Sequence, residues 1–281
     1  MPPIIIIGMH RAGTSLLTEL LQKMGVFIGN DLDDNFESQF FCNLNIWAFK
    51  QTGAEWDNPY NMRFIDNEVA DGLSENFDRH LHSRRMKKKY GKAFAKLKNT
   101  DSLWAWKDPR NTFTLNLWQR IFPAAKILHI YRNPIDVAES LRKREQYFRD
   151  LRDSKTRTGL RKKYHEYFLT SKRLYSQSVR AYYLDEGIKL WEEYTGQALK
   201  YQENALHIAY EKLLTEPQME LEKICSFADI KADEETIQQA VSDINPDRKF
   251  AFMTSKNLIE KYKEIQDSEI LKALGYHNII H

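Results

Sequence analysis

Residues 4–15 read IIIIGMHRAGTS, and this stretch decides the fold. The four isoleucines make a short, β-branched apolar run, which is typical of a buried parallel strand. Leucines then repeat at helical spacing over residues 16–21. The residues in between, from Gly8 to Gly13, therefore form a loop that leads from a strand into a helix. Backbone N–H groups and a helix N-terminus point at a bound anion in such a loop, so the stretch predicts a phosphate-binding site.

This loop differs from the phosphate loop of nucleoside triphosphatases at one position. That loop reads GxxxxGK[ST], and its lysine reaches the β- and γ-phosphates. Here Thr14 stands at the lysine position, and Arg11 supplies a cation inside the loop. The chain also has no clear DxxG or NKxD segment, which argues against an ordinary kinase or GTPase. A plain strand-to-helix turn capped by Thr14 or Ser15 is the alternative.

The composition indicates an ordinary globular protein. The 281 residues include 42 Lys and Arg against 39 Asp and Glu, so the formal net charge of +3 does not point to nucleic acid. Two runs, 84–98 and 142–173, are locally basic, and each is either a solvated helix face or a rim that attracts anions. The two cysteines, Cys42 and Cys225, form neither a disulfide framework nor a metal site and suit a reducing compartment.

The sequence gives no sign of a membrane protein. No apolar run is long enough to span a bilayer, and no charged leader or cleavage site precedes the strand at 4–7. We therefore expect a cytoplasmic protein without a membrane span. The length fits a single domain over residues 1–281.

Strands alternate with helices along most of the chain. Further strands are predicted at 103–106, 126–131 and 206–210, with helical patterns between them. This alternation predicts an α/β fold, with three α/β/α layers and a mostly parallel sheet. The tail from residue 245 is poorly patterned.

A parallel sheet binds its ligands beyond the carboxyl ends of the strands, and three predicted loops should meet there. Each loop carries a cation: Arg11 lies in the first, Lys107 and Arg110 in the second, and Arg132 in the third. Arginine at a strand end can bind a phosphate with two parallel hydrogen bonds. The convergence predicts a ligand rich in phosphate.

The third loop adds a serine at a regular spacing. Ser140 follows Arg132 by eight residues, about two turns into the next helix, where its hydroxyl can bond the same phosphate oxygens. The alternative is a simple helix start, with Asn133 as N-cap and Pro134 at the first helical position. Both interpretations are compatible, because a cap also aims the helix.

Taken together, these motifs resemble those of the sulfotransferases that use 3′-phosphoadenylyl sulfate (PAPS). The GxxRxGTS loop at 8–15 resembles their 5′-phosphosulfate loop, and RNPxDVAxS at 132–140 resembles their 3′-phosphate motif. KDPR at 107–110 is similar to the KDPR or KxPR segment of bacterial and carbohydrate-type members, and residues 210–217 resemble their YEDLLxxP segment. The matches occur in the family's order.

The resemblance implies a P-loop NTPase-like sulfotransferase architecture with PAPS as donor, adenosine 3′,5′-bisphosphate as product and no required metal. It implies that Arg11 contacts the 5′-phosphate and the sulfuryl group, and that Arg132 and Ser140 hold the 3′-phosphate. The other residues expected at the cofactor lie in the loop and the first turn of its helix: Ala12, Gly13, Thr14, Ser15 and Leu16.

Sulfuryl transfer resembles phosphoryl transfer, in which positioning and charge stabilisation dominate. Lys107 is the predicted second cation on the sulfuryl oxygens. Members of the family that act on carbohydrates or protein tyrosine use a glutamate some 20–30 residues after the loop cation, and Glu37 lies 26 residues after Arg11. This resemblance makes Glu37 the predicted general base. Asp108 and His10 are the alternative bases. The alternative role for Glu37 itself is structural, as an acid at a helix start that interacts favourably with the helix dipole.

The predicted acceptor is a hydroxyl group, on a saccharide or a glycan-like metabolite, because the motifs look most like the carbohydrate-type and bacterial members. Helical insertions on the acceptor side are expected within 36–100 and 145–200. The aromatic residues that could line the acceptor pocket or belong to the core are Phe40, Phe41, Trp47, Trp56 and Tyr60. A P-loop-like nucleotide kinase and a non-catalytic nucleotide- or phosphate-binding protein are the alternative functions.

Overall fold

The computed structural model describes residues 2–84, 103–154, 177–201 and 204–280. They form two compact units, Met1–Asn133 with Glu192–Ala251 and Pro134–Trp191 with Phe252–His281. The first unit contains the sheet, and each unit is described here by itself. That residues 1–281 form a single domain stays a prediction.

The sheet of the first unit has four strands, all parallel, in the order β2-β1-β3-β4. Their bounds are β1 (Ile4–Ile7), β2 (Ala105–Lys107), β3 (Lys126–Tyr131) and β4 (Ala205–Ala209). Ile6 pairs with Lys107, and Ile7 pairs with His129. The loops that follow β1, β2 and β3 therefore begin at the same edge, as predicted from the alternation of strands and helices.

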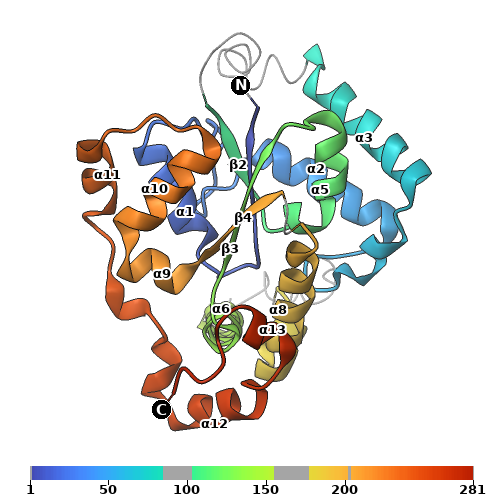
Figure 1. Cartoon of the computed structure of the whole chain (residues 1–281). Coiled ribbons are helices and arrows are strands. Elements are labelled where there is room, and N and C mark those ends of the chain that lie inside the picture. The colour runs from blue at the N-terminus through green and yellow to red at the C-terminus, as the bar shows by residue number, and fades with distance from the viewer. Residues whose placement is uncertain (1, 85–102, 155–176, 202–203, 281) are drawn as a thin grey trace. The chain divides into compact units, whose positions relative to one another are not determined.

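Helices cover both faces of this sheet, which explains the run of four isoleucines (Figure 1). Ile4 and Ile6 lie in one apolar core, and Ile5 and Ile7 lie in the other. Successive side chains of a strand point to opposite faces, so a strand buried on both sides is apolar throughout. The predicted α/β/α layering is confirmed.

On one face, the buried leucines of α1 (Thr14–Lys23) pack with Ile4 and Ile6. Three later helices complete this core: α9 (Tyr210–Thr215), α10 (Pro217–Ala228) and α11 (Glu234–Val241). The other face is covered by α2 (Gln39–Thr52), α3 (Asn67–Leu81) and α5 (Asn111–Ile121), with the 3-10 helix η1 (Pro59–Phe64) packed beside them. Figure 1 shows these two groups of helices on either side of the strands.

Aromatic side chains fill the second core. Trp106 stacks on Phe41 with ring centroids 4.3 Å apart, and Trp118 meets Trp106 edge-on at 5.1 Å. Phe40 and Phe41 are buried in this core, so the structure places them there rather than in an acceptor pocket. Offset and edge-to-face contacts of this kind stabilise a pair by about 1 kcal/mol beyond the area that it buries.

The second unit is built from helices. They are α6 (Pro134–Ser154), η2 (Arg180–Tyr182), the turns of α8 (Leu184–Leu199) up to Trp191, α12 (Lys256–Ile265) and α13 (Glu269–Ala273). Gly187 of α8 allows close packing, because an added Cβ would lie 3.0 Å from the Cβ of Ala138 in α6. The buried carboxylate of Glu145 accepts hydrogen bonds from the backbone N–H groups of Gln177 and Ser178.

Some sequence-based expectations differ from the structure. The tail from residue 245 contains α12 and α13, so the expectation of a poorly patterned tail was wrong. In α12, Leu258, Ile259 and Tyr262 recur at helical spacing and lie on its buried side. Tyr210 begins α9 instead of ending a strand. Most of the basic run 84–98, and residues 155–173 of the second basic run, lie outside the described residues.

In the described start of the second basic run, two arginines lie beside acids of the same helix: Arg142 with Glu139 and Arg144 with Glu145. At these two positions the arginines are ion-paired with buried acids of their own helix. Among the described residues, no helix combines the length and the apolar character that crossing a bilayer requires.

Candidate active site

The loop after β1 is fixed at its first glycine. The Gly8 N–H donates to Thr112 Oγ1 at 3.1 Å, which ties the loop to the start of α5. Gly8 has a φ of +140°, and an added Cβ would lie 2.3 Å from the carbonyl oxygen of Ile130 in β3. Only glycine fits here, and the loop is held between a neighbouring strand and a helix.

The second glycine stands at the N-terminus of α1. Gly13 has a φ of +101°, and an added Cβ would lie 2.3 Å from Cδ2 of Tyr210. Arg11, at the exposed tip of the loop, also has a left-handed φ of 69°. Left-handed residues just before a helix turn successive backbone N–H groups toward one point, where the helix dipole favours an anion. The geometry suits a phosphate.

Tyr210 connects this loop with the third one. Its ring lies against Gly13, and the guanidinium carbon of Arg132 lies 4.6 Å from the ring centroid. The next residue, Glu211, accepts a hydrogen bond from Asn133 N–H at 3.0 Å. Reasoning from residue types missed Tyr210, and the only signal was its place in the segment that resembles YEDLLxxP. Tyr210 therefore links Gly13 of the first loop to Arg132 of the third.

Arg132 and Ser140 lie in different units. Arg132 directly follows β3 in the first unit, and its Nη2 donates to the carbonyl oxygen of Arg248 at 3.2 Å. Ser140 is half-buried on α6 in the second unit, and α6 begins at Pro134, as a proline at the first helical position predicts. That the two hold one phosphate stays a prediction from their spacing.

The four remaining predicted cofactor residues have different surroundings. Ala12 is fully buried, and Thr14 is the buried first residue of α1. Leu16 packs against the core. Ser15 Oγ donates to the carbonyl oxygen of Asn35 at 3.0 Å, so in this structure its hydroxyl joins α1 to the loop before α2.

A buried ion pair lies at the end of β2. Lys107 Nζ donates to Glu37 Oε1 at 2.9 Å, and the lysine side chain is 1% exposed against 14% for the glutamate. Burial raises the pKa of the Glu37 carboxyl, the charge of Asp108 raises that pKa further, and Lys107 opposes both effects. A raised pKa makes Glu37 a stronger base than a solvated glutamate.

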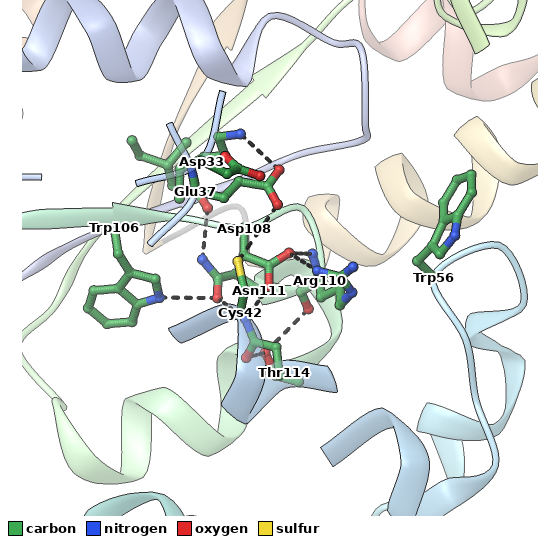
Figure 2. Close-up of polar contacts among 12 residues, drawn as sticks. Asp33, Glu37, Cys42, Trp56, Trp106, Asp108, Arg110, Asn111 and Thr114 are labelled. Atoms are coloured by element: carbon green, nitrogen blue, oxygen red, sulfur yellow. Dashed lines mark hydrogen bonds and ion pairs between the residues drawn. The ribbon is translucent and has the colours of Figure 1, made fainter. Parts of the chain in front are cut away.

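Asp108, the alternative base, is held in a hydrogen-bond network (Figure 2). Its Oδ1 accepts from the backbone N–H and from Nη1 of Arg110, each at 2.9 Å, and its Oδ2 accepts from Asn45 Nδ2 at 2.9 Å. Asn45 also donates to Asn111, whose Oδ1 accepts from Trp106. The side chain of Asp108 is fully buried, so these contacts make it an anchor for the second loop.

His10, the other alternative, is packed among aromatic rings. Its ring meets Trp56 edge-on at 4.7 Å and Tyr194 at 6.0 Å. The Tyr194 hydroxyl donates to the carbonyl oxygen of Trp56 at 2.8 Å. These contacts fix the imidazole beside the loop and suit a structural role. Trp56, which the sequence left open between the acceptor pocket and the core, is half-buried here.

Glu37, Cys42 and Asp108 offer three ligand atoms within 4.8 Å of one another, a geometry that can hold a metal ion. Their surroundings favour a hydrogen-bond network instead. Burial raises the pKa of the Cys42 thiol, and its Sγ lies 3.7 Å from Glu37 Oε2 as a weak donor. Metal binding requires a thiolate, and the buried ammonium of Lys107 already neutralises the glutamate.

A cavity of about 380 Å³ lies elsewhere in the first unit. It is bordered by η1, α5 and the end of α8, and it includes Tyr60, Arg63 and Asn116. For Tyr60, the sequence left open an acceptor pocket or the core. The structure places it in this cavity, whose lining includes neither the 8–15 loop nor Glu37.

A known protein family matches most of the chain. The family model described as "Sulfotransferase family" matches residues 2–234, and the chain belongs to this family. No curated protein matched the chain in sequence.

One solved sulfotransferase domain shares the fold, and two further solved sulfotransferases align with the chain less closely. The sulfotransferase domain from the curacin biosynthetic pathway aligns with a TM-score of 0.52 at 16% identity, over 99% of each chain. The sulfotransferase domain of the Synechococcus PCC 7002 olefin synthase gives 0.49 at 18% identity, over 98% of this chain and 95% of that one. A sulfotransferase from Alicyclobacillus acidocaldarius gives 0.48 at 18% identity, over 99% and 97%.

Proposed function

We propose that this sulfotransferase transfers a sulfuryl group from PAPS to a hydroxyl acceptor. The observation that carries the proposal is the Glu37–Lys107 pair, a buried carboxylate and ammonium that lie at the sheet edge where the phosphate-type loop begins. A donor phosphosulfate needs backbone N–H donors and cations around it, and the acceptor hydroxyl needs a base. The loops and strand ends at this edge contain such N–H groups, the cations Arg11 and Lys107, and the carboxylate of Glu37.

The donor would bind along the first and third loops. The backbone N–H groups of Gly13, Thr14 and Ser15, at the N-terminus of α1, suit the 5′-phosphosulfate, and Arg11 would neutralise it. The Ala12 N–H donates to the carbonyl oxygen of Met9 at 3.2 Å, so Ala12 would line the loop. Arg132, held over the ring of Tyr210, would bind the 3′-phosphate together with Ser140. A 3′-phosphate site also distinguishes PAPS from ATP.

The transfer would proceed by in-line attack. The acceptor oxygen forms a bond to sulfur while the bond from sulfur to the bridging oxygen of the 5′-phosphate breaks, and adenosine 3′,5′-bisphosphate leaves with the electron pair. Glu37 takes the proton of the acceptor hydroxyl. Arg11 and Lys107 stabilise the charge on the sulfuryl oxygens and on the leaving phosphate. None of these steps requires a metal.

The acceptor we propose is a saccharide or a glycan-like metabolite, on the likeness of the 8–15 and 107–110 motifs to carbohydrate-type and bacterial sulfotransferases. A screen of hydroxyl compounds with radiolabelled sulfuryl donor tests this. Labelled sugar products support the proposal. Labelling of phenols alone, with no saccharide modified, would overturn the acceptor class.

Calorimetry tests the donor. We expect adenosine 3′,5′-bisphosphate to bind without magnesium and ATP to show no binding under the same conditions. Magnesium-dependent ATP binding with no binding of the bisphosphate would contradict the proposal and favour a nucleotide kinase. Bisphosphate binding without transfer to any acceptor would favour a non-catalytic binding protein.

A further inference from the structure

The loop that presents Glu37 is closed by one aspartate. Asp33 Oδ1 accepts hydrogen bonds from the backbone N–H groups of Asn35 at 2.9 Å and of Glu37 at 2.8 Å. The Asp33 N–H donates to the Glu37 carbonyl at 3.0 Å, and the Phe36 N–H donates to the Asp33 carbonyl at 3.0 Å. One side chain therefore fixes the backbone of the residue that carries the proposed base.

This loop has a backbone conformation that needs such support. Phe36 has a left-handed φ of 61°, which is unfavourable for a bulky residue. Conformations of this kind persist only where neighbouring contacts hold them. On the far side of Glu37, Asp31 accepts from Ser38 Oγ at 2.9 Å and from Phe40 N–H at 2.7 Å. The backbone is thus held both before and after Glu37.

We propose that Asp33 is a positioning residue that holds the Glu37 carboxylate against Lys107. The inference rests on the proposed role of Glu37 as base. Asp33 acts through the backbone N–H of Glu37, and its own contacts are with the loop. A displacement of about 1 Å at a catalytic group can cost on the order of 100-fold in rate, so a single backbone anchor has a measurable effect.

The same loop is joined to the phosphate-binding loop. Ser15 Oγ, in the first turn of α1, donates to the carbonyl oxygen of Asn35, which lies between Asp33 and Glu37 in the chain. The phosphate-binding loop and the loop that carries Glu37, the proposed base, are therefore connected by a short path of hydrogen bonds. Asp33 keeps Asn35 in place for this contact through its bond to the Asn35 N–H.

Asp33 also affects the charge around Glu37. The charged and titratable groups that face the Glu37 carboxyl are Lys107 at the end of β2, Asp108 and Arg110 in the loop that follows, Cys42 from α2, and Asp33 from its own loop. The negative charge of Asp33 adds to the rise of the pKa of Glu37. Asparagine keeps the acceptor oxygen and removes the charge, whereas alanine removes both.

The two roles can be measured on the free protein, without any acceptor. The side-chain carboxyl of Glu37 is titrated by NMR in wild type, Asp33→Asn and Asp33→Ala, with the exposed neighbour Asp34→Asn as matched control. We expect a lower pKa of Glu37 in Asp33→Asn and no change in Asp34→Asn. In Asp33→Ala we expect exchange broadening, or a shift that reports loss of the Lys107 contact.

Kinetics gives the second readout. For Asp33→Ala we expect kcat to fall by about 10- to 100-fold with little change in affinity for adenosine 3′,5′-bisphosphate. Asp33→Asn should recover most of that loss, and the acid limb of its pH–rate profile should move to lower pH.

Wild-type kcat and an unchanged Glu37 titration in Asp33→Ala would overturn the inference. If Glu37→Gln is inactive while Asp33→Ala is fully active, the inference fails and the proposed function stands. If wild type transfers no sulfuryl group while the NMR shifts are as expected, the proposed function fails and Asp33 still positions Glu37.

Discussion

The ammonium of Lys107 lies 2.9 Å from the carboxylate of Glu37, although 70 residues separate them in the sequence. The contact joins the last residue of β2 to the loop before α2. Because the pair is almost completely buried, neither charge is stable there alone. Each of the two charges therefore depends on the other.

Glu37→Gln should remove the base while it keeps the shape of the side chain. We expect kcat to fall by about 10²- to 10⁴-fold, the range that general base catalysis supplies. Binding of adenosine 3′,5′-bisphosphate, measured by calorimetry, should stay as in wild type. Glu55→Gln, at an exposed position, is the matched control. A normal transfer rate in Glu37→Gln would eliminate Glu37 as the base.

Lys107→Met should raise the pKa of Glu37 further, because the lysine is the group that opposes the effects of burial and of Asp108. The carboxylate then takes up a proton at higher pH, and the acid limb of the kcat/KM profile should move upward. Lys107→Arg, which keeps the charge, should move it less. An unchanged limb in Lys107→Met would show that Glu37 does not limit the rate at low pH.

Arg132→Ala tests the 3′-phosphate site. Loss of a charge-assisted bond to phosphate costs about 1.5–3 kcal/mol, or roughly 10- to 150-fold in affinity. We expect this loss for adenosine 3′,5′-bisphosphate and none for adenosine 5′-phosphate, which lacks the 3′ group. Equal losses for the two nucleotides in calorimetry would place Arg132 elsewhere on the cofactor.

Gly13→Ala tests the close approach of Tyr210 to the phosphate loop. The added Cβ would lie 2.3 Å from the tyrosine ring, so the loop or the ring must move. Gly25→Ala is the control, because Gly25 also has a positive φ but has no atom within 4 Å of the added Cβ. We expect a lower melting temperature and weaker bisphosphate binding in Gly13→Ala than in Gly25→Ala. Equal effects would mean that backbone strain alone accounts for the need for glycine.

A histidine pair, with His129 buried and His207 partly buried, should make the protein sensitive to acid. The Nδ1 atoms of His129 in β3 and His207 in β4 lie 2.7 Å apart, so one carries the hydrogen and the other accepts it. Burial, and then the neighbouring His207, lower the pKa of His129 to about 3 from an ordinary value of 6.5. The unfolded chain therefore binds a proton between these values that the folded protein excludes.

The free energy of unfolding is not reduced by this pair above about pH 6.5, where both histidines are neutral in the folded and unfolded states. As the pH falls toward 3, the free energy of unfolding drops by up to about 1.4 kcal/mol per pH unit. Urea unfolding at pH 7.5 and pH 5 measures it. The double variant His129→Leu/His207→Leu should lose less free energy of unfolding over this interval than wild type. An equal loss in both proteins would show that other groups control the acid sensitivity.

Much of the fold was predictable because its signals are local. The isoleucine run, the two glycines of the first loop and the proline that begins α6 each act through nearest-neighbour sterics or through the periodicity of a single element. The helices α12 and α13 were not predicted, although apolar residues of α12 recur at helical spacing. Both helices are short, at 10 and 5 residues, and charged residues separate their apolar positions.

The sequence by itself determined the parallel α/β sheet, the phosphate-type loop and the set of cations that follow its strands. Only the tertiary structure decided which groups meet: Glu37 with Lys107, Asp108 inside its own network, and Tyr210 between Gly13 and Arg132. The physical reason is that a charge buried by the fold must find a partner in space. Sequence spacing places residues at an edge of the sheet, but packing assigns the partners.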